Sequence, residues 1–118
     1  MAERLRQRGA VPKANRYVDL SARLDEEDYL FEMKSTTKDN PHSQIRRGLS
    51  QLYEYRYLAK EPNAKLSIVA SSKIPPDLSW METYLPEDRK IAFEWTSDFE
   101  KFHTEESSKK LLGDLSTP

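Results

Sequence analysis

The sequence predicts an α/β domain with a central mixed β-sheet of about four strands, flanked by α-helices. Alternating apolar and polar residues predict two strands, at 16–24 and 29–36. A helical pattern follows from residue 41 to about 58 or 60, and then a short, mostly apolar segment at 65–71 is typical of a buried parallel strand. A strand–helix–strand order of this kind forms a parallel pair with a right-handed crossover.

The later elements are less regular. Residues 78–85 predict a short helix that packs large side chains, and residues 91–95 predict the last strand. The domain is expected to span residues 1–103, with a polar C-terminal tail at 104–118. A short helical stub is expected at 2–9, ended by Gly9.

Composition excludes several classes of protein. Of the 118 residues, 36% are hydrophobic and 33% are charged, which suits one domain with a modest core. There is no cysteine, so disulfides, thiolate zinc sites and cysteine-held iron–sulfur clusters are excluded. No apolar run approaches 18 residues and the first residues do not resemble a signal peptide. We therefore expect a cytoplasmic protein with no membrane partner.

Basic charge is concentrated in the first two thirds of the chain. Residues 1–76 contain 14 lysines and arginines against 10 aspartates and glutamates, whereas residues 77–118 contain 5 against 10. This distribution is compatible with a polyanionic partner, although the whole chain has no basic excess.

The two predicted strands form a hairpin around the polar turn 25–28. Residues two apart on a strand share a face, so Glu32 and Lys34 lie together while Phe31 and Met33 point to the other face. With the turn centred between residues 26 and 27, Asp19 is opposite Lys34. With the turn shifted toward residue 25, Asp19 is opposite Glu32. Either register brings two acids and a lysine together.

The helix is expected to start with Asn40 as its cap and Pro41 in its first turn. At 100° per residue, one line along the helix carries two glutamines, a glycine, a tyrosine and a leucine: Gln44, Gly48, Gln51, Tyr55 and Leu58. A buried helix edge with two glutamines and a tyrosine is expected to face polar groups. Gly48, which has no side chain, would let the helix backbone approach its neighbours closely. Tyr53 and Tyr57 lie on the opposite, exposed side.

Two neighbouring carboxylates are stable only with a cation between them. A hard divalent ion, Mg²⁺ or Mn²⁺, suits Asp19 and Glu32, with the Met33 carbonyl as a third ligand. Lys34 could orient a metal-bound water or stabilise charge on a phosphorane-like transition state. Gln51 and Tyr55 could brace the lysine, the water or the phosphate.

Asp19, the run Glu32-Met33-Lys34 and the later Gln51-x-x-x-Tyr55 together resemble the PD-(D/E)xK nuclease superfamily, in its RecB-like branch with a QxxxY motif. The resemblance covers about residues 16–72. It implies a restriction-endonuclease-like core, with Asp19 and Glu32 as metal ligands and Lys34 as the catalytic lysine. It also implies hydrolysis of DNA phosphodiester bonds by a metal-activated water, in defence or DNA repair.

The residues expected to contact nucleic acid are Arg16, Ser35, His42, Gln44 and Arg47. Two other functions stay open on the same fold. One is a catalytically silent nucleic-acid-binding module, and the other is a protein-assembly module. The two exposed tyrosines make a homodimer or larger assembly plausible, and two sites would serve to cut both strands of a duplex.

Overall fold

The structure is a computed structural model that describes residue 6 and residues 20–24, 26–98 and 100–112. Its elements are β1 (Leu20–Leu24), β2 (Glu27–Lys34), α2 (Pro41–Leu58), β3 (Lys65–Ala70), η1 (Pro76–Leu78), α3 (Met81–Thr83), η2 (Tyr84–Asp88), β4 (Ile91–Trp95), β5 (His103–Thr104) and α4 (Glu106–Leu112). Apart from Arg6, the predicted stub at 2–9 lies outside the described residues, as do residues 16–19 of the predicted first strand.

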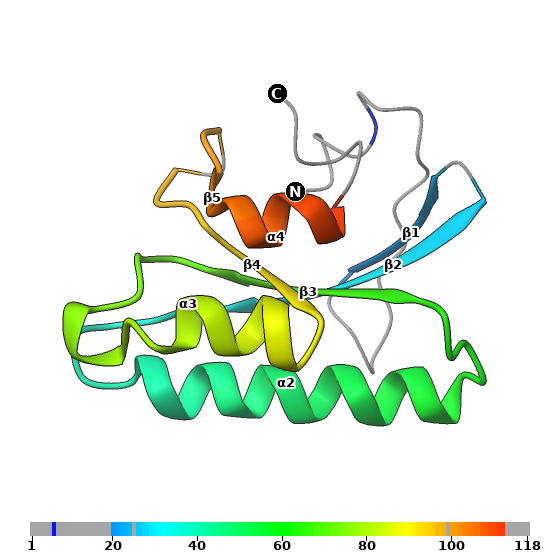
Figure 1. The fold of residues 1–118 in the computed structure, drawn as a ribbon, viewed down its shortest axis with the longest axis horizontal. Coiled ribbons are helices and arrows are strands. Elements are labelled where there is room, and N and C mark those ends of the chain that lie inside the picture. Colours follow the sequence, from blue (N-terminus) through cyan, green and yellow to red (C-terminus); the bar gives the residue numbers. More distant parts are fainter. Residues whose placement is uncertain (1–5, 7–19, 25, 99, 113–118) are drawn as a thin grey trace.

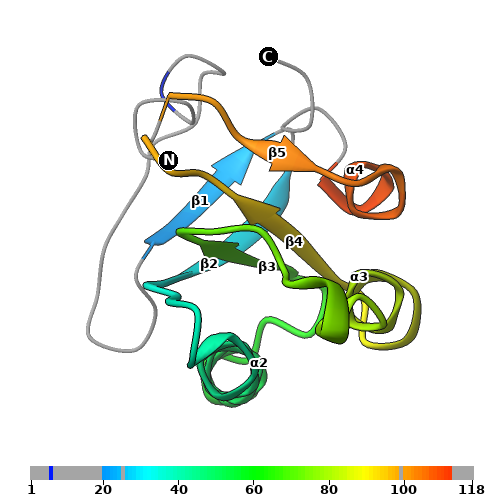
Figure 2. The same cartoon turned by 90° about the vertical axis from the view of Figure 1, so that its left-hand side faces the viewer.

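The chain folds around one mixed sheet of five strands in the order β1-β2-β3-β4-β5. The pairs β2–β3 and β3–β4 are parallel, and the outer pairs β1–β2 and β4–β5 are antiparallel. Helices α2 and α3 lie on one face of the sheet and α4 lies on the other (Figures 1 and 2). The predicted α/β class and mixed sheet are confirmed, with one strand more than predicted.

The hairpin turn is shorter than predicted. Leu24 already pairs with Glu27, so the second half of the predicted turn belongs to β2. Glu26 adopts the left-handed region at φ 65°, which type I′ hairpin turns use. The acidic residues have cross-strand partners, since Glu27 forms an ion pair of 2.6 Å with Lys65 of β3 and Asp28 pairs with Arg23 of β1. The register Leu20↔Phe31 is the one expected from a turn shifted toward residue 25.

Each face of the sheet has its own apolar cluster. Leu30, Ile68 and Phe93 pack with α2 and α3 on one face. On the other face Phe31 packs with Val69, Ala92 and Leu112, and Met33 borders this cluster. The alternation predicted for β2 is therefore confirmed, with Phe31 and Met33 on the face opposite α2.

Helix α2 begins and ends close to the predicted residues. Asn40 precedes it, but the Asn40 side chain accepts a hydrogen bond from the Thr37 amide at 2.6 Å and does not cap the helix. The helix ends in a Schellman turn, with the Glu61 amide donating to the Arg56 carbonyl and Lys60 at φ 57°. Leu58, predicted on the buried line, is 66% exposed because the last turn of the helix extends beyond the core cluster.

The C-terminal segment differs from the predicted polar tail. His103–Thr104 form β5 and Glu106–Leu112 form α4, and α4 covers the sheet face opposite α2 (Figure 2). The Phe93 amide donates to Ser108 Oγ at 3.0 Å, and Leu112 is buried against Val69. Ser108, Leu111 and Leu112 face the sheet, whereas the charged side chains of α4, Glu106, Lys109 and Lys110, are exposed.

Candidate functional site

Glu32 and Lys34 stand side by side near the carboxyl end of β2, on the face that α2 covers. Lys34 Nζ is 3.4 Å from Glu32 Oε2, and the two side chains are only 12% and 4% exposed. In the parallel partner strand, Ile68 is paired with Glu32 and Ala70 with Lys34. The sequence therefore correctly placed this carboxylate and this ammonium together, and the fold buries both.

A buried ion pair contributes little to the stability of a fold. Removing two charges from water costs several kcal/mol per ion, and their attraction often only offsets that cost. The same position on the apolar face of a sheet could hold two aliphatic side chains at no loss. A pair kept in such a place is a candidate for chemistry, since buried, charged groups at a strand end are typical of functional sites.

Helix α2 forms the roof over Lys34. A Cβ atom added to Gly48 would lie 3.5 Å from both Cγ and Cε of Lys34 and 3.6 Å from Ile68 Cδ1. The lysine stem thus runs directly under the helix backbone, and the close approach predicted for Gly48 is found. The 3.5 Å spacing is nevertheless ordinary van der Waals contact, so a methyl group fits there without displacing the lysine.

Gly48→Ala is therefore expected to raise the free energy of unfolding by about 0.5–1 kcal/mol, because alanine has the higher helix propensity and the added methyl meets no clash. Urea unfolding followed by circular dichroism measures the change. Gly48→Leu serves as the contrasting variant, since its longer side chain would collide with Lys34 and destabilise the fold. A destabilised Gly48→Ala protein would show that α2 packs against the Lys34 side chain more tightly than the 3.5 Å contact indicates.

The flank of α2 nearest β2 carries the predicted polar residues. Gln44 Nε2 donates to the Ser35 carbonyl at 2.9 Å, which ties the start of α2 to the end of β2. Tyr55 packs against the core cluster on the α2 face. Gln51 Oε1 is buried, and it has no hydrogen-bond partner in the part of the chain that the structure describes. A buried acceptor of this kind is suited to a water molecule or a ligand.

Hydroxyl groups gather just beyond the carboxyl ends of β2 and β3. The Thr36 amide donates to Ser71 Oγ at 2.8 Å, and Thr36 Oγ1 lies 2.6 Å from Ser72 Oγ. The Ser71 amide in turn donates to the Lys34 carbonyl at 3.1 Å. This network fixes the backbone next to Lys34. This network was not predicted from the sequence, although hydroxyl residues directly after two adjacent parallel strands are a signal for it.

Other predicted site residues lie apart or are not described. Asp19 and Arg16 fall outside the described residues. Arg47 is exposed. His42 is turned toward Trp80, about 160° around the helix from Gln44. Among the residues that are described, no three His, Cys, Asp or Glu side chains form a metal-binding group.

The two tyrosines predicted to be exposed differ from one another. Tyr57 is 83% exposed, as predicted. Tyr53 is half-buried against the core cluster, and its hydroxyl donates to the Arg89 carbonyl. The prediction of an exposed Tyr53 is wrong because η2 and the turn after it come back against α2. Both tyrosines nevertheless line one open hollow at the end of α2, together with Arg56, Lys60 and Pro62.

No helix in the described ranges is both long and apolar enough to cross a membrane. Comparisons of the chain with protein-family models, with curated proteins and with solved structures found no match.

Proposed function

We propose that this chain is a metal-dependent nuclease that hydrolyses DNA phosphodiester bonds, with a site of the PD-(D/E)xK type on a restriction-endonuclease-like core. The buried Glu32–Lys34 pair at the end of β2 is the observation that carries the proposal. The order of hairpin, helix and parallel strand, with Gln51 and Tyr55 on that helix, supports it. The RecB-like branch is proposed on the same residues.

The donor set suits a hard divalent ion. Glu32 supplies a carboxylate, and we propose Asp19, which precedes β1 in the sequence, and the Met33 carbonyl as the other ligands. When bound, Mg²⁺ or Mn²⁺ would supply Lewis-acid stabilisation of negative charge on the phosphate and lower the pKa of an attacking water.

The chain's own groups would perform the remaining tasks. The Lys34 ammonium is a donor held in a largely water-free place, where it can orient an attacking water or stabilise charge on a phosphate oxygen. The buried Gln51 Oε1 can accept a hydrogen bond from that water. The Tyr55 hydroxyl on the same flank of α2 can donate to the phosphate. The network of Thr36, Ser71 and Ser72 holds the strand ends in place.

Metal-dependent cleavage of DNA is the direct test. Linear and circular DNA incubated with the protein and Mn²⁺ are expected to yield shortened or nicked products, and excess EDTA is expected to abolish them. Electrophoresis of both substrates separates attack from an end, which spares the circle, from internal cleavage. Intact DNA in millimolar Mn²⁺ would contradict the proposal. DNA retention without cleavage would instead favour the silent binding module.

A further inference from the structure

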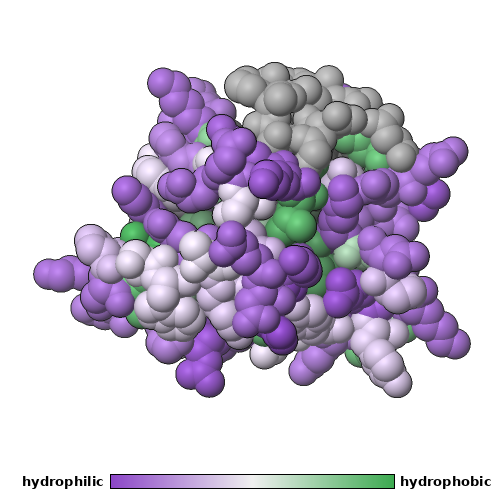
Figure 3. Space-filling view, viewed as in Figure 1, coloured by the Kyte–Doolittle hydropathy of each residue, from purple (hydrophilic) through white to green (hydrophobic). Residues whose placement is uncertain are grey.

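A hollow of about 360 Å³ lies between α2 and α3, on the flank of α2 away from Lys34. His42, Arg46 and Ser50 of α2 form one wall of the hollow. Trp80, just before α3, and Tyr84 of η2 form the other wall, and apolar side chains of the core form the floor. Its volume falls within the range of about 300–1,000 Å³ found for small-molecule pockets. Residues of intermediate hydropathy, drawn nearly white, gather in the region of α3 in Figure 3.

The rings in this hollow contact one another. Trp80 makes an edge contact with His42 at 5.8 Å between ring centroids and a tilted contact with Tyr84 at 5.6 Å. The Trp80 carbonyl accepts hydrogen bonds from the Tyr84 amide and the Thr83 hydroxyl. Even so, Trp80 is 48% exposed. A large aromatic side chain that is ordered on one side and open on the other is a platform for a planar ligand.

The electrostatics of the hollow favour an anion. Arg46 and His42 contribute a guanidinium and an imidazole, and Ser50 contributes a hydroxyl donor. None of the described residues that line the hollow is a carboxylate. A ligand with a flat ring system and a negative charge could therefore contact both the aromatic rings and the basic side chains of the hollow. An unpaired nucleotide of a nucleic-acid strand has this chemistry, with a base to stack on Trp80 and a phosphate for Arg46.

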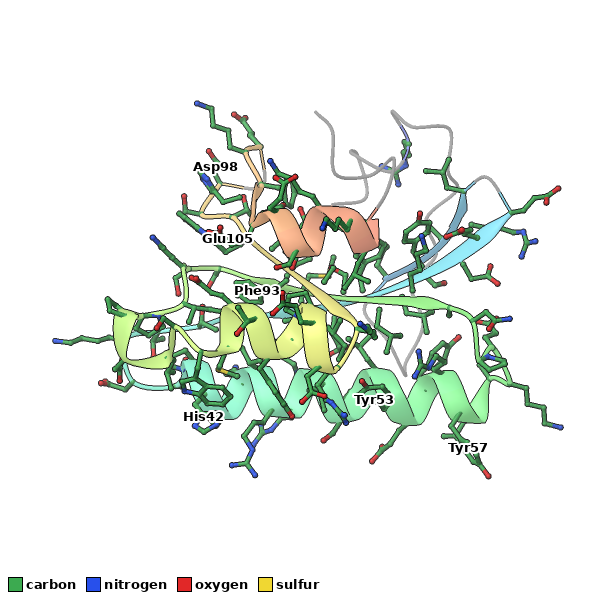
Figure 4. The ribbon with its side chains drawn as sticks, in the orientation of Figure 1. His42, Tyr53, Tyr57, Phe93, Asp98 and Glu105 are labelled. Atoms are coloured by element: carbon green, nitrogen blue, oxygen red, sulfur yellow. The ribbon has the colours of Figure 1, made fainter. Side chains whose placement is uncertain are left out.

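The position of the hollow relates it to the proposed reaction centre. His42 lies in the first turn of α2, near where the connection from Lys34 enters the helix. His42 is labelled at this end of the molecule in Figure 4, and Tyr57 at the opposite end of the same helix. A single DNA strand that passes around the start of α2 would thus reach both the hollow and the end of β2.

We propose that this hollow is a stacking subsite for an unpaired nucleotide of single-stranded DNA. The inference rests on the proposed nuclease function and names its substrate class. Bases within a duplex are stacked on one another, so a side-chain platform of this kind selects a single strand or a frayed end.

Fluorescence anisotropy of a labelled oligo(dT) tests the subsite in EDTA, where cleavage does not contribute. Trp80→Ala is expected to weaken binding about tenfold by loss of stacking. Arg46→Ala is expected to weaken it severalfold and to lower the slope of log K against log salt by about one. Tyr57→Ala and Lys110→Ala remove an exposed ring and an exposed charge elsewhere, and both are expected to bind within about twofold of wild type. Circular dichroism confirms that each variant is folded.

The outcomes separate this inference from the proposed function. Unchanged DNA affinity of Trp80→Ala and Arg46→Ala would overturn the subsite. An equal loss of affinity in Tyr57→Ala, or tighter binding of duplex than of single-stranded DNA, would overturn it as well. So would the lack of any measurable affinity of the wild type at low salt. If these appear together with Mn²⁺-dependent cleavage, the nuclease proposal stands without the subsite. Selective loss in Trp80→Ala without any cleavage would support the subsite and contradict the nuclease.

Discussion

Lys34→Met is expected to lower the rate of metal-dependent DNA cleavage by at least about a hundredfold, measured under conditions in which circular dichroism shows the variant to be folded. Methionine keeps the unbranched stem that packs under Gly48 and removes only the ammonium. That ammonium lies 3.4 Å from Glu32 in a nearly closed space, where water screens charge weakly. A donor there stabilises developing charge on a phosphate far more than an exposed lysine does.

The kinetic pattern distinguishes chemistry from binding. Loss of a group that acts in the transition state lowers kcat and kcat/KM together, whereas loss of a substrate contact raises KM alone. Lys110→Met, on α4 at the other face of the sheet, is the matched control and is expected to cleave at the wild-type rate. Full Mn²⁺-dependent activity of Lys34→Met, measured beside this control, would remove Lys34 from the reaction centre.

The core of the fold could be predicted because its elements have strong periodic patterns. Alternation placed Phe31 and Met33 on one face of β2 and Glu32 and Lys34 on the other, and the packing clusters confirm it. The helical line of α2 correctly included Gly48. The placement of Glu32 beside Lys34 could therefore be predicted from their two-residue spacing along β2 alone.

The errors arose where tertiary partners decide the structure. Glu27 looks like a turn residue, but in β2 it pairs with Leu24 and forms an ion pair with Lys65, which is far away in the sequence. The segment of α4 is mostly polar, and its docking depends on a hydrogen bond between Ser108 and β4. The contact between His42 and Trp80 joins two residues far apart in the sequence. Composition and periodicity do not contain these pairings.

A double-mutant cycle is expected to show that the Glu32–Lys34 pair is costly to break but not needed for stability. Glu32→Met leaves the Lys34 ammonium buried beside an aliphatic chain, and we expect it to lower the free energy of unfolding by about 3–5 kcal/mol. Adding Lys34→Met removes the unpaired charge, and the double variant is expected to recover most or all of the wild-type stability. Urea unfolding of the four proteins gives the coupling energy directly.

The cycle also bears on why the pair is present. If two methionines at these positions support the fold as well as the charged pair does, stability does not explain a carboxylate and an ammonium on the apolar face under α2. Reaction chemistry would explain them, since sites tuned for function commonly sacrifice stability. A double variant clearly less stable than the wild type would show the opposite. It would identify the pair as a structural element, and the proposed nuclease would lose its main physical support.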